Sequence, residues 1–406
     1  MKYRLAVVTS HVIQYQDPLF RRLAAHPELD LTVLFCSSVG AKEYLDHDLA
    51  VSLRWDLDML YGYNHRFVGN LSPMKTGLWR LVNPAAIGPI LSREFDAVLV
   101  MGWGYVTTWL VYAASWAVRV PFLIAGDSSV IAAALSMKQR ARKYLLGLLF
   151  SRAAGLMVSG ARNREFYRHY GAGEDRFFPM PLAIDNERFF NASRMTQAER
   201  DAERRMLGIE PTHTVILYSG KLIARKNPLQ SLEAYERMKH RDRTAMIYAG
   251  EGVERGMLEE YVRSRHLDNV HFLGFVNQRR IPEIYGISDV LVLPSSHEPW
   301  GLVVNEAMAC GLPVVVSDKV GACGDGDIVR DGENGFIFRA GDIGRLAEIL
   351  DTLAFDAGLV RRMGMRSLEI IQSWSFNRDV DGIVAALEAT LGDARHGELA
   401  PSHQFG

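Results

Sequence analysis

The chain has 406 residues, more than one hydrophobic core usually serves, so about two domains are expected. Its composition, 48% hydrophobic and 23% charged, is that of an ordinary globular protein, and the net charge of −1 gives no reason to expect nucleic acid as a partner. Three widely spaced cysteines, Cys36, Cys310 and Cys323, fit neither a disulfide framework nor a metal pattern, which favours the cytoplasm.

No stretch approaches the roughly 18 uninterrupted apolar residues of a membrane span, and the first apolar run is too short for a signal peptide. The alternation of apolar runs and helical patterns in the first half predicts βαβ units around a parallel sheet. Residues 39–84 are aromatic-rich and aperiodic, and we interpret them as an insertion that helps to shape a binding cleft. The strands are expected at 5–8, 31–35, 97–101, 122–125 and 155–158, and helices at 18–25 and 109–118.

A basic stretch, residues 138–143, precedes the apolar run 144–150. Together they could form a cationic amphipathic helix that lies on an anionic membrane. A domain helix with a solvated basic start and a buried apolar end is the favoured interpretation, since dense apolar content is common in core helices. The predicted location is therefore the cytoplasm, with peripheral contact at the inner face of the membrane as an open alternative.

Beyond Pro179 the chain becomes polar and charged, and the alternation then restarts, which predicts a second doubly wound domain. Its strands are expected at 215–218, 245–249, 270–273, 290–293 and 314–317. The predicted organisation is an N-terminal, acceptor-side domain (1–182), a connection (183–212), a second domain (213–375), a helix that packs back on the first domain (376–391) and a frayed tail (392–406).

Glu298 and Glu306 lie between two apolar strands of the second half. Glu298 falls in the loop at the carboxyl end of a strand, where open α/β sheets bind their ligands. Glu306 falls about one turn into the next helix, expected over 302–310, whose first N–H groups can hold an anion. The arrangement suits a sugar nucleotide, with the sugar at one acid, the diphosphate at the helix start and the ribose at the other acid.

Basic residues follow the strand at 215–218. Lys221 and Lys226, after Gly220, are five residues apart, so both ammonium groups could reach one diphosphate and neutralise a departing phosphate. A solvated basic helix start is the commoner explanation of such a pair when it stands alone.

Two further loops follow strands. Gly250 and Gly252 flank a loop where a nucleotide base could approach the backbone closely, although a plain turn explains them equally well. Phe275, in the segment 272–276, could frame the edge of the base or belong to the core.

The second half of the chain resembles the nucleotide-binding domain of retaining glycosyltransferases of family 4, which have the GT-B fold. The likeness spans about residues 213–390. Residues 298–318 match the family's two-glutamate motif, and Gly220, Lys221 and Lys226 match its basic motif, in which Arg is usual in place of Lys221. The resemblance implies an α/β protein of GT-B type, with two Rossmann-like, doubly wound domains facing each other across a cleft.

The resemblance also implies residue roles. Without it, Glu298 would be interpreted as a charge at a helix start and Glu306 as a helix-surface acid. With it, Lys226 and Lys221 hold the diphosphate, backbone N–H groups of Gly301 and Leu302 contact the phosphates, Glu298 binds donor-sugar hydroxyls, and Glu306 accepts from the ribose hydroxyls.

The first half departs from the family's pattern. The family often places a His after the strand expected here at 122–125, to contact the donor sugar, whereas this chain has Asp127 in that loop. Asp127 could replace that contact, act as a base, or cap the following helix. His11, at the end of the first strand, is the other candidate, although a lone His is more often structural.

Asp325 and Asp327 superficially match the Asp-x-Asp metal motif of other glycosyltransferases, but that motif belongs to a different fold. No metal is expected, because lysines can neutralise the diphosphate. No cofactor is expected either, and the donor substrate is expected to be a UDP or GDP sugar.

We therefore predict a retaining, metal-independent, hexosyltransferase-type enzyme that moves a sugar from a nucleotide diphosphate to a glycan, lipid-linked or small-molecule acceptor. Synthesis of cell-surface polysaccharide or glycoconjugate is the expected setting. In this interpretation neither Glu298 nor Glu306 acts as nucleophile or general acid. The alternatives are a sugar-nucleotide epimerase of the same fold and a non-catalytic protein that binds sugar nucleotides.

Overall fold

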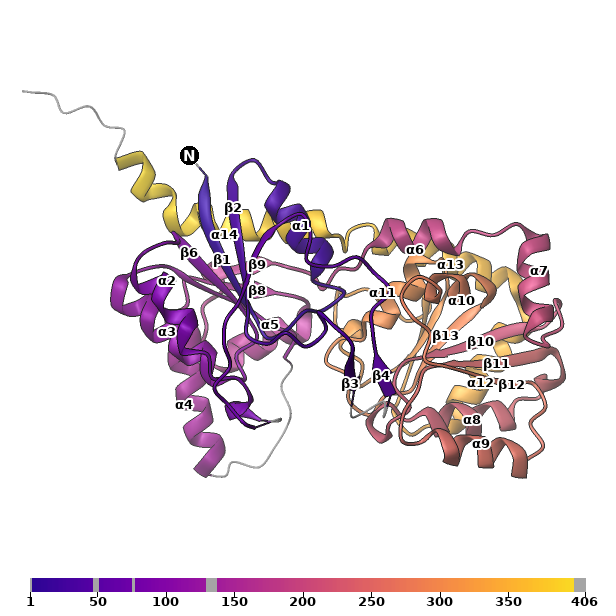
Figure 1. The fold of residues 1–406 in the computed structure, drawn as a ribbon. Helices are drawn as coiled ribbons and strands as arrows, with labels where there is room; N and C mark the ends of the chain where they lie inside the picture. Colours follow the sequence, from indigo (N-terminus) through magenta and orange to yellow (C-terminus); the bar gives the residue numbers. More distant parts are fainter. Residues whose placement is uncertain (1, 47–50, 75–76, 129–136, 398–406) are drawn as a thin grey trace, which may run out of the picture. The chain divides into compact units, whose positions relative to one another are not determined.

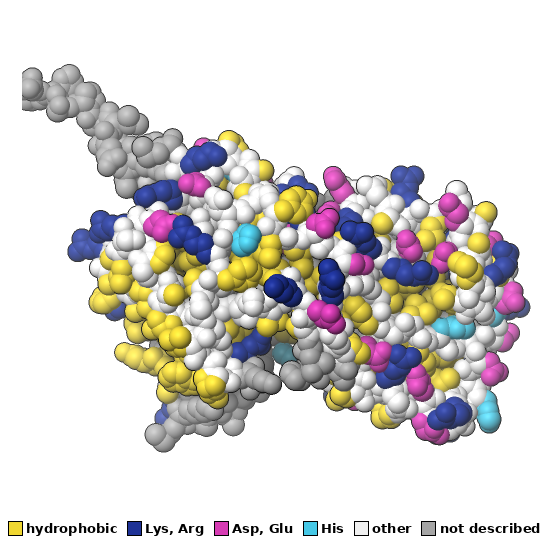
Figure 2. Space-filling model, in the orientation of Figure 1, with side chains coloured by type: hydrophobic (Ala, Val, Ile, Leu, Met, Phe, Trp, Pro, Cys, Tyr) yellow, Lys and Arg dark blue, Asp and Glu magenta, His cyan; other side chains and the backbone are white. Residues whose placement is uncertain are grey.

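The computed structural model describes residues 2–46, 51–74, 77–128 and 137–397, which form two compact units (Figure 1). Unit 2 is made of Lys42–Leu57 and Leu182–Ser375, and unit 1 of the rest of the chain. Each unit is a parallel sheet with helices packed on it, so the predicted α/β class with two Rossmann-like domains is confirmed. Acidic and basic side chains are interspersed over the face shown in Figure 2, in line with the net charge of −1.

A seven-stranded parallel sheet forms the centre of unit 1, in the spatial order β5-β2-β1-β6-β7-β8-β9. The strand order reverses between β1 and β6, which makes this pair the topological switch point of the sheet. The strands are β1 (Tyr3–Thr9), β2 (Leu29–Phe35), β5 (Asn64–Phe67), β6 (Ala97–Met101), β7 (Phe122–Ala125), β8 (Gly155–Val158) and β9 (Phe177–Pro179).

The helices of unit 1 cover this sheet. Helix α14 packs against α1, β8 and β9, and it continues to Gly397, so the expectation of a frayed segment from residue 392 is wrong as far as residue 397. Residues 398–406 lie outside the described part of the chain. The helices are α1 (Asp17–Ala25), α2 (Ile87–Leu91), α3 (Val106–Val118), α4 (Met137–Arg152), α5 (Ala161–His169) and α14 (Phe376–Gly397), with 3₁₀ turns η1 (Leu78–Arg80), η2 (Pro84–Ala86) and η3 (Glu174–Arg176).

Helix α4 carries the basic stretch. Residues 140–145 are exposed, whereas Leu146, Leu149 and Phe150 are buried in the core of unit 1. This burial agrees with a domain helix that has a solvated start. No helix in the described residues is long and apolar enough to cross a bilayer.

A six-stranded parallel sheet forms the centre of unit 2, in the order β12-β11-β10-β13-β14-β15, with its switch point between β10 and β13. The strands are β10 (Thr214–Ser219), β11 (Thr244–Ala249), β12 (Val270–Gly274), β13 (Val290–Leu293), β14 (Val314–Ser317) and β15 (Gly335–Phe338). The helices are α6 (Asn186–Ser193), α7 (Gln197–Met206), α8 (Pro228–Arg237), α9 (Arg255–Ser264), α10 (Ile281–Ile287), α11 (Leu302–Ala309), α12 (Ile343–Phe355) and α13 (Ala357–Ile371), with 3₁₀ turns η4 (Ala224–Lys226), η5 (Arg241–Arg243) and η6 (Gly321–Cys323).

The segment expected as a bare connection, 183–212, is instead a structured part of unit 2. Its helices α6 and α7 pack against α10. The charges that suggested a solvated linker are used in packing: Arg200 and Arg204 both pair with Asp289 at 2.7 Å, and Arg204 is buried. A buried arginine is tolerated because its donors are satisfied by a carboxylate and by backbone carbonyls.

Part of the expected N-terminal insertion also belongs to unit 2. Strands β3 (Tyr44–Asp46) and β4 (Val51–Leu53) pair antiparallel, and we call the described residues of this segment, 42–46 and 51–57, the 42–57 hairpin. The rest of the insertion stays in unit 1, where β5 adds to the edge of the sheet beside β2.

Candidate functional site

Two predicted site residues meet at the switch point of unit 2. Lys226 ends η4 after strand β10, and Glu298 lies in the loop after β13. Lys226 Nζ is 2.8 Å from Glu298 Oε2, and the two side chains are 11% and 12% exposed. A cation and a carboxylate are thus held together, largely desolvated, where open α/β sheets bind ligands.

Backbone hydrogen bonds hold the loops that carry these two groups. Ser296 N–H donates to Arg225 O at 2.9 Å, and the Asn227 side chain donates to Pro294 O at 3.2 Å, so the two loops are tied to each other. Glu298 is bonded through its backbone to the segment after β14, with Gly321 N–H donating to Glu298 O at 2.9 Å. The ion pair therefore rests on fixed backbone.

Helix α11 begins directly beside Glu298. Its N-cap, Gly301, has φ +98°, and a Cβ there would lie 3.3 Å from Glu298 Cγ. Val304 N–H donates to Gly301 O at 2.8 Å, and the N–H groups of Leu302 and Val303, which come before it in the first turn, are placed to receive an anion. Trp300 Nε1 donates to Asn305 Oδ1 at 2.9 Å, which fixes the loop to the helix.

Glu306 is buried, with 2% of its surface exposed. The Tyr285 hydroxyl donates to Glu306 Oε2 at 2.7 Å. The surface-acid interpretation is therefore wrong, and the ribose role stays a prediction. The sequence did not point to Tyr285, a single tyrosine in the apolar pattern of α10. It lies on a different helix from Glu306, and no local sequence pattern indicates which residue will bond a buried acid on another helix.

Close backbone packing explains why residues 250 and 252 are glycines. A Cβ at Gly250 would lie 1.8 Å from Gly220 O, and one at Gly252 would lie 2.3 Å from Leu222 O. The loops after β10 and β11 thus press backbone against backbone, which only glycine permits. The Lys226 side chain lies close to Gly220, because a Cβ at Gly220 would be 3.5 Å from Lys226 Nζ.

The remaining predicted residues of unit 2 lie in the same group of loops. Lys221 is half-buried directly after β10, and its carbonyl accepts from the Tyr218 hydroxyl at 3.0 Å. Phe275 follows β12 and is half-buried, so it is not simply part of the core. Its ring centroid is 6.1 Å from that of Trp55 in the 42–57 hairpin.

The two candidates of unit 1 occupy different strand ends. His11 follows β1, beside the switch point, and its Nδ1 is 2.8 Å from Ser10 Oγ. Burial, helped by the charge of Arg80, lowers the His11 pKa from 6.5 to about 4, so the imidazole is neutral at pH 7. Asp127 is exposed after β7, with β6 between its strand and β1. A helix start that Asp127 could cap would fall in 129–136, outside the described residues.

The Asp-x-Asp segment follows η6, with Asp325 exposed and Asp327 buried. Within the ranges that the structure describes, no group of three or more His, Cys, Asp or Glu side chains could hold a metal ion.

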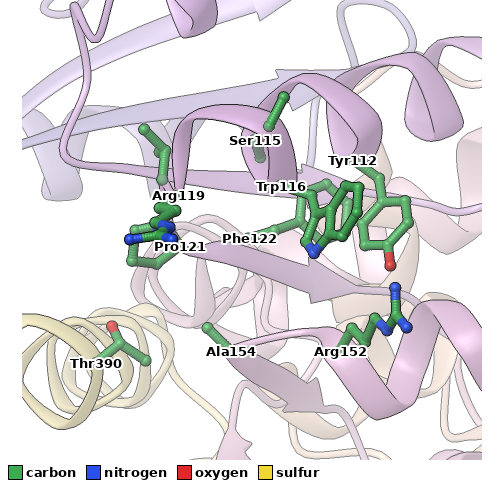
Figure 3. Close-up of a pocket in the computed structure, with 11 residues that line it drawn as sticks. Tyr112, Ser115, Trp116, Arg119, Pro121, Phe122, Arg152, Ala154 and Thr390 are labelled. Atoms are coloured by element: carbon green, nitrogen blue, oxygen red, sulfur yellow. The ribbon is translucent and has the colours of Figure 1, made fainter.

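A pocket of about 610 Å³ lies in unit 1 at the amino ends of β7 and β8 (Figure 3). Trp116, Arg119 and Arg152 line it, and the Arg152 guanidinium stacks 5.6 Å from the Trp116 ring centroid. Parallel α/β sheets bind ligands at the opposite, carboxyl edge. None of the predicted site residues lines this pocket.

Comparison with known proteins finds similarity to glycosyltransferases in the second half of the chain. Residues 199–368 match the family "Glycosyl transferases group 1". The D-inositol 3-phosphate glycosyltransferase of Geodermatophilus obscurus is 33% identical over 242 residues, 56% of this chain and 50% of that protein. The enzyme of the same name from Nocardia farcinica is 28% identical over 237 residues, 56% of this chain and 51% of that protein. The chain thus spans about half the length of these curated relatives.

Solved structures share the fold over almost the whole chain. Anabaena HepE in complex with UDP has a TM-score of 0.74 at 18% identity, covering 96% of this chain and 100% of that one. A glycosyltransferase from Rickettsia africae has a TM-score of 0.72 at 17% identity, covering 96% and 98%. The protein therefore has the GT-B fold, and residues 199–368 are similar to the group 1 glycosyltransferases.

Proposed function

We propose that this protein is a retaining glycosyltransferase that moves a sugar from a nucleotide-diphosphate donor to an acceptor. The observation that carries the proposal is the contact between Lys226 and Glu298 at the switch point of unit 2. The two groups complement the two halves of a sugar phosphate, because an ammonium group donates to phosphate oxygens and a carboxylate accepts from sugar hydroxyls.

The pair also explains how both charges are kept at a largely desolvated place before the donor arrives. Each neutralises the other, and an isolated charge there would be costly. In our proposal the donor inserts its phosphate against Lys226 and its sugar hydroxyls against Glu298. Low exposure then strengthens both contacts relative to water.

In the transfer step the bond between the sugar's anomeric carbon and the phosphate oxygen breaks, and the bond to the acceptor oxygen forms on the same face. The acceptor's proton passes to the departing phosphate. Lys226 and the N–H groups at the start of α11 stabilise the negative charge that develops on the leaving diphosphate. Glu298 binds hydroxyl groups of the sugar and does not act as a nucleophile. The charge of Lys226 makes a divalent cation unnecessary.

The comparisons suggest which donors and acceptors to test first. HepE was solved with UDP and with UDP-glucose, so UDP sugars come before GDP and ADP sugars. The curated relatives act on D-inositol 3-phosphate, which makes a phosphorylated polyol the first acceptor. A relative in the GT-B fold, WaaG, serves lipopolysaccharide synthesis, so lipid-linked glycans come second.

The test has two stages. A donor present at a hundred times its dissociation constant should raise the free energy of unfolding by about 2.7 kcal/mol, which a thermal shift screen of UDP, GDP and ADP sugars detects. The donor that stabilises is then incubated with acceptors, and the anomeric configuration of the product is determined. Absence of any stabilising donor would reject the proposal. Conversion of the donor to an epimer without acceptor would identify an epimerase, and binding without turnover a non-catalytic protein.

A further inference from the structure

The 42–57 hairpin is fastened to the loop that follows β12 in unit 2. The Asn277 side-chain amide donates to Arg54 O at 2.7 Å. The Arg279 N–H lies 3.2 Å from both carboxylate oxygens of Asp56. These residues are more than two hundred positions apart in the chain, so the contacts are specific to the tertiary fold.

Between these two anchors stands Trp55. Its ring centroid is 6.1 Å from that of Phe275, with the planes at 59° to each other. Both side chains are half-buried, so the aromatic pair keeps part of its surface open. Ligand sites are lined mainly by apolar and aromatic side chains, so a partly open aromatic pair beside the carboxyl edge of the sheet is a candidate contact surface for a ligand.

The chain is hydrogen-bonded on both sides of Leu57, the last residue of the 42–57 hairpin. Asp56 is bonded within unit 2, Asp58 O accepts from Arg21 within unit 1, and only Leu57 separates the two aspartates. The Asp17 carboxylate accepts from Leu60 N–H at 2.9 Å just beyond. Within unit 2, the residues on either side of Trp55 are thus held by Asn277 and Arg279 without any ligand.

The spacing between the loop that carries Lys226 and the loop that carries Phe275, the ring partner of Trp55, fits the length of a nucleoside diphosphate. Strands β10, β11 and β12 are consecutive neighbours, and adjacent strands are about 4.8 Å apart. The loop after β12 is thus about 10 Å along the carboxyl edge of the sheet from the loop that carries Lys226. A diphosphate at Lys226 would place its nucleoside toward β11 and β12.

We propose that Trp55 is a donor-binding residue whose indole, packed on Phe275, gives a stacking face to the nucleobase of the donor. The 42–57 hairpin, which follows the first strands of the chain, thereby completes a site built otherwise by the second half. The inference rests on the proposed function, since it assumes a nucleotide donor. Stacking of a base on an aromatic ring tolerates any base, so the residue sets affinity and leaves base identity to backbone groups.

The test compares the parent with Trp55→Ala, Trp55→Phe, Trp116→Ala and Lys226→Ala by calorimetric titration with UDP and GDP. Trp55→Ala should raise the dissociation constant of the preferred nucleotide about 5- to 100-fold, whereas Trp55→Phe, which keeps an aromatic face, should stay within about threefold of the parent. Trp116→Ala removes an indole that is 66% exposed at the Figure 3 pocket of unit 1, not at the strand ends of unit 2 where the donor is proposed to bind, and should change nothing. Nucleotide-dependent quenching of tryptophan fluorescence should shrink in Trp55→Phe.

The outcomes separate the two proposals. If Trp55→Ala binds the nucleotide as tightly as the parent while Lys226→Ala binds it weakly, the role of Trp55 is overturned and the proposed function stands. If the parent binds no nucleotide, or Lys226→Ala binds it normally, the donor site itself is wrong. A lower melting temperature of Trp55→Ala, together with unchanged nucleotide affinity, would show that Trp55 only stabilises the hairpin. Unchanged fluorescence quenching in Trp55→Phe would point the same way, and this result would also overturn the inference.

Discussion

The two units share a Rossmann-like sheet but differ at their switch points. In unit 2 the loops at the switch point hold an ammonium group and a carboxylate 2.8 Å apart, and backbone hydrogen bonds join these loops to each other. In unit 1, His11 beside the switch point is neutral and bonded to its neighbour Ser10, while Asp127 is exposed one strand further along.

The difference indicates how the work is divided. Fixed, desolvated charges preorganise a site for a constant chemical group, and a sugar diphosphate is such a group. One neutral ring and one solvated acid at separate strand ends impose less, which would suit the acceptor side of the transfer proposed above. Unit 2 should therefore be intolerant of substitution at its site, and unit 1 more tolerant.

The largest expected effect is that of Lys226→Ala. It removes the cation that stabilises the leaving group and leaves Glu298 buried without its charge partner, so kcat/KM for transfer should fall by about 10²–10³. Lys319→Ala is the matched control, because the Lys319 side chain is 55% exposed and pairs with its neighbour Asp318. Unchanged turnover in Lys226→Ala, measured as nucleotide release, would refute the assignment of the diphosphate site.

Next comes Gly250→Ala. Its Cβ would lie 1.8 Å from a backbone carbonyl, so the loops after β10 and β11 must separate, and we expect about 3 kcal/mol of destabilisation in chemical denaturation. Gly256→Ala, in the first turn of α9 with open space around it, should be neutral or stabilising by up to about 1 kcal/mol. Equal stability of the two variants would contradict the close approach of the two loops.

The pH dependence of unit 1 gives a third test. Because burial lowers the His11 pKa to about 4, the unfolded chain binds the proton more readily than the folded protein between pH 6.5 and 4. The free energy of unfolding should fall as the pH falls through that window, by up to about 3 kcal/mol. His11→Gln should flatten this slope, whereas His169→Gln, at an exposed position of α5, should preserve it.

The smallest effect is expected for Asp127→Asn. Solvent screens an exposed carboxylate, so its loss should lower kcat less than about tenfold and leave the donor's dissociation constant unchanged. Steady-state kinetics with a saturating donor measures this. A drop as large as that of Lys226→Ala would make Asp127 the base of the reaction and would end the contrast between the two units.

Local patterns in the chain were enough to predict the α/β class and most of the strands. Runs such as Val290–Leu293 and Val314–Ser317 are buried on both faces, and a short, continuous apolar run between turn signals is typical of a buried parallel strand. The positions of Lys226 and Glu298 after strands could also be predicted, because the carboxyl ends of parallel strands meet at one edge of a sheet. Their contact confirms that they are neighbours; their roles in transfer are still a prediction.

Other features depended on contacts between distant parts of the chain, which no local pattern encodes. The charges of α7 suggested a solvated linker until Asp289 and the carbonyls around Arg204 were in place to satisfy them. Gly250 could be interpreted as a plain turn, because the carbonyl that requires a glycine belongs to another strand's loop. Periodicity decides which face of an element is buried, but tertiary packing alone decides what covers it. For that reason the sequence predicted a donor site in the second half, and only the fold placed Trp55 of the first half beside it.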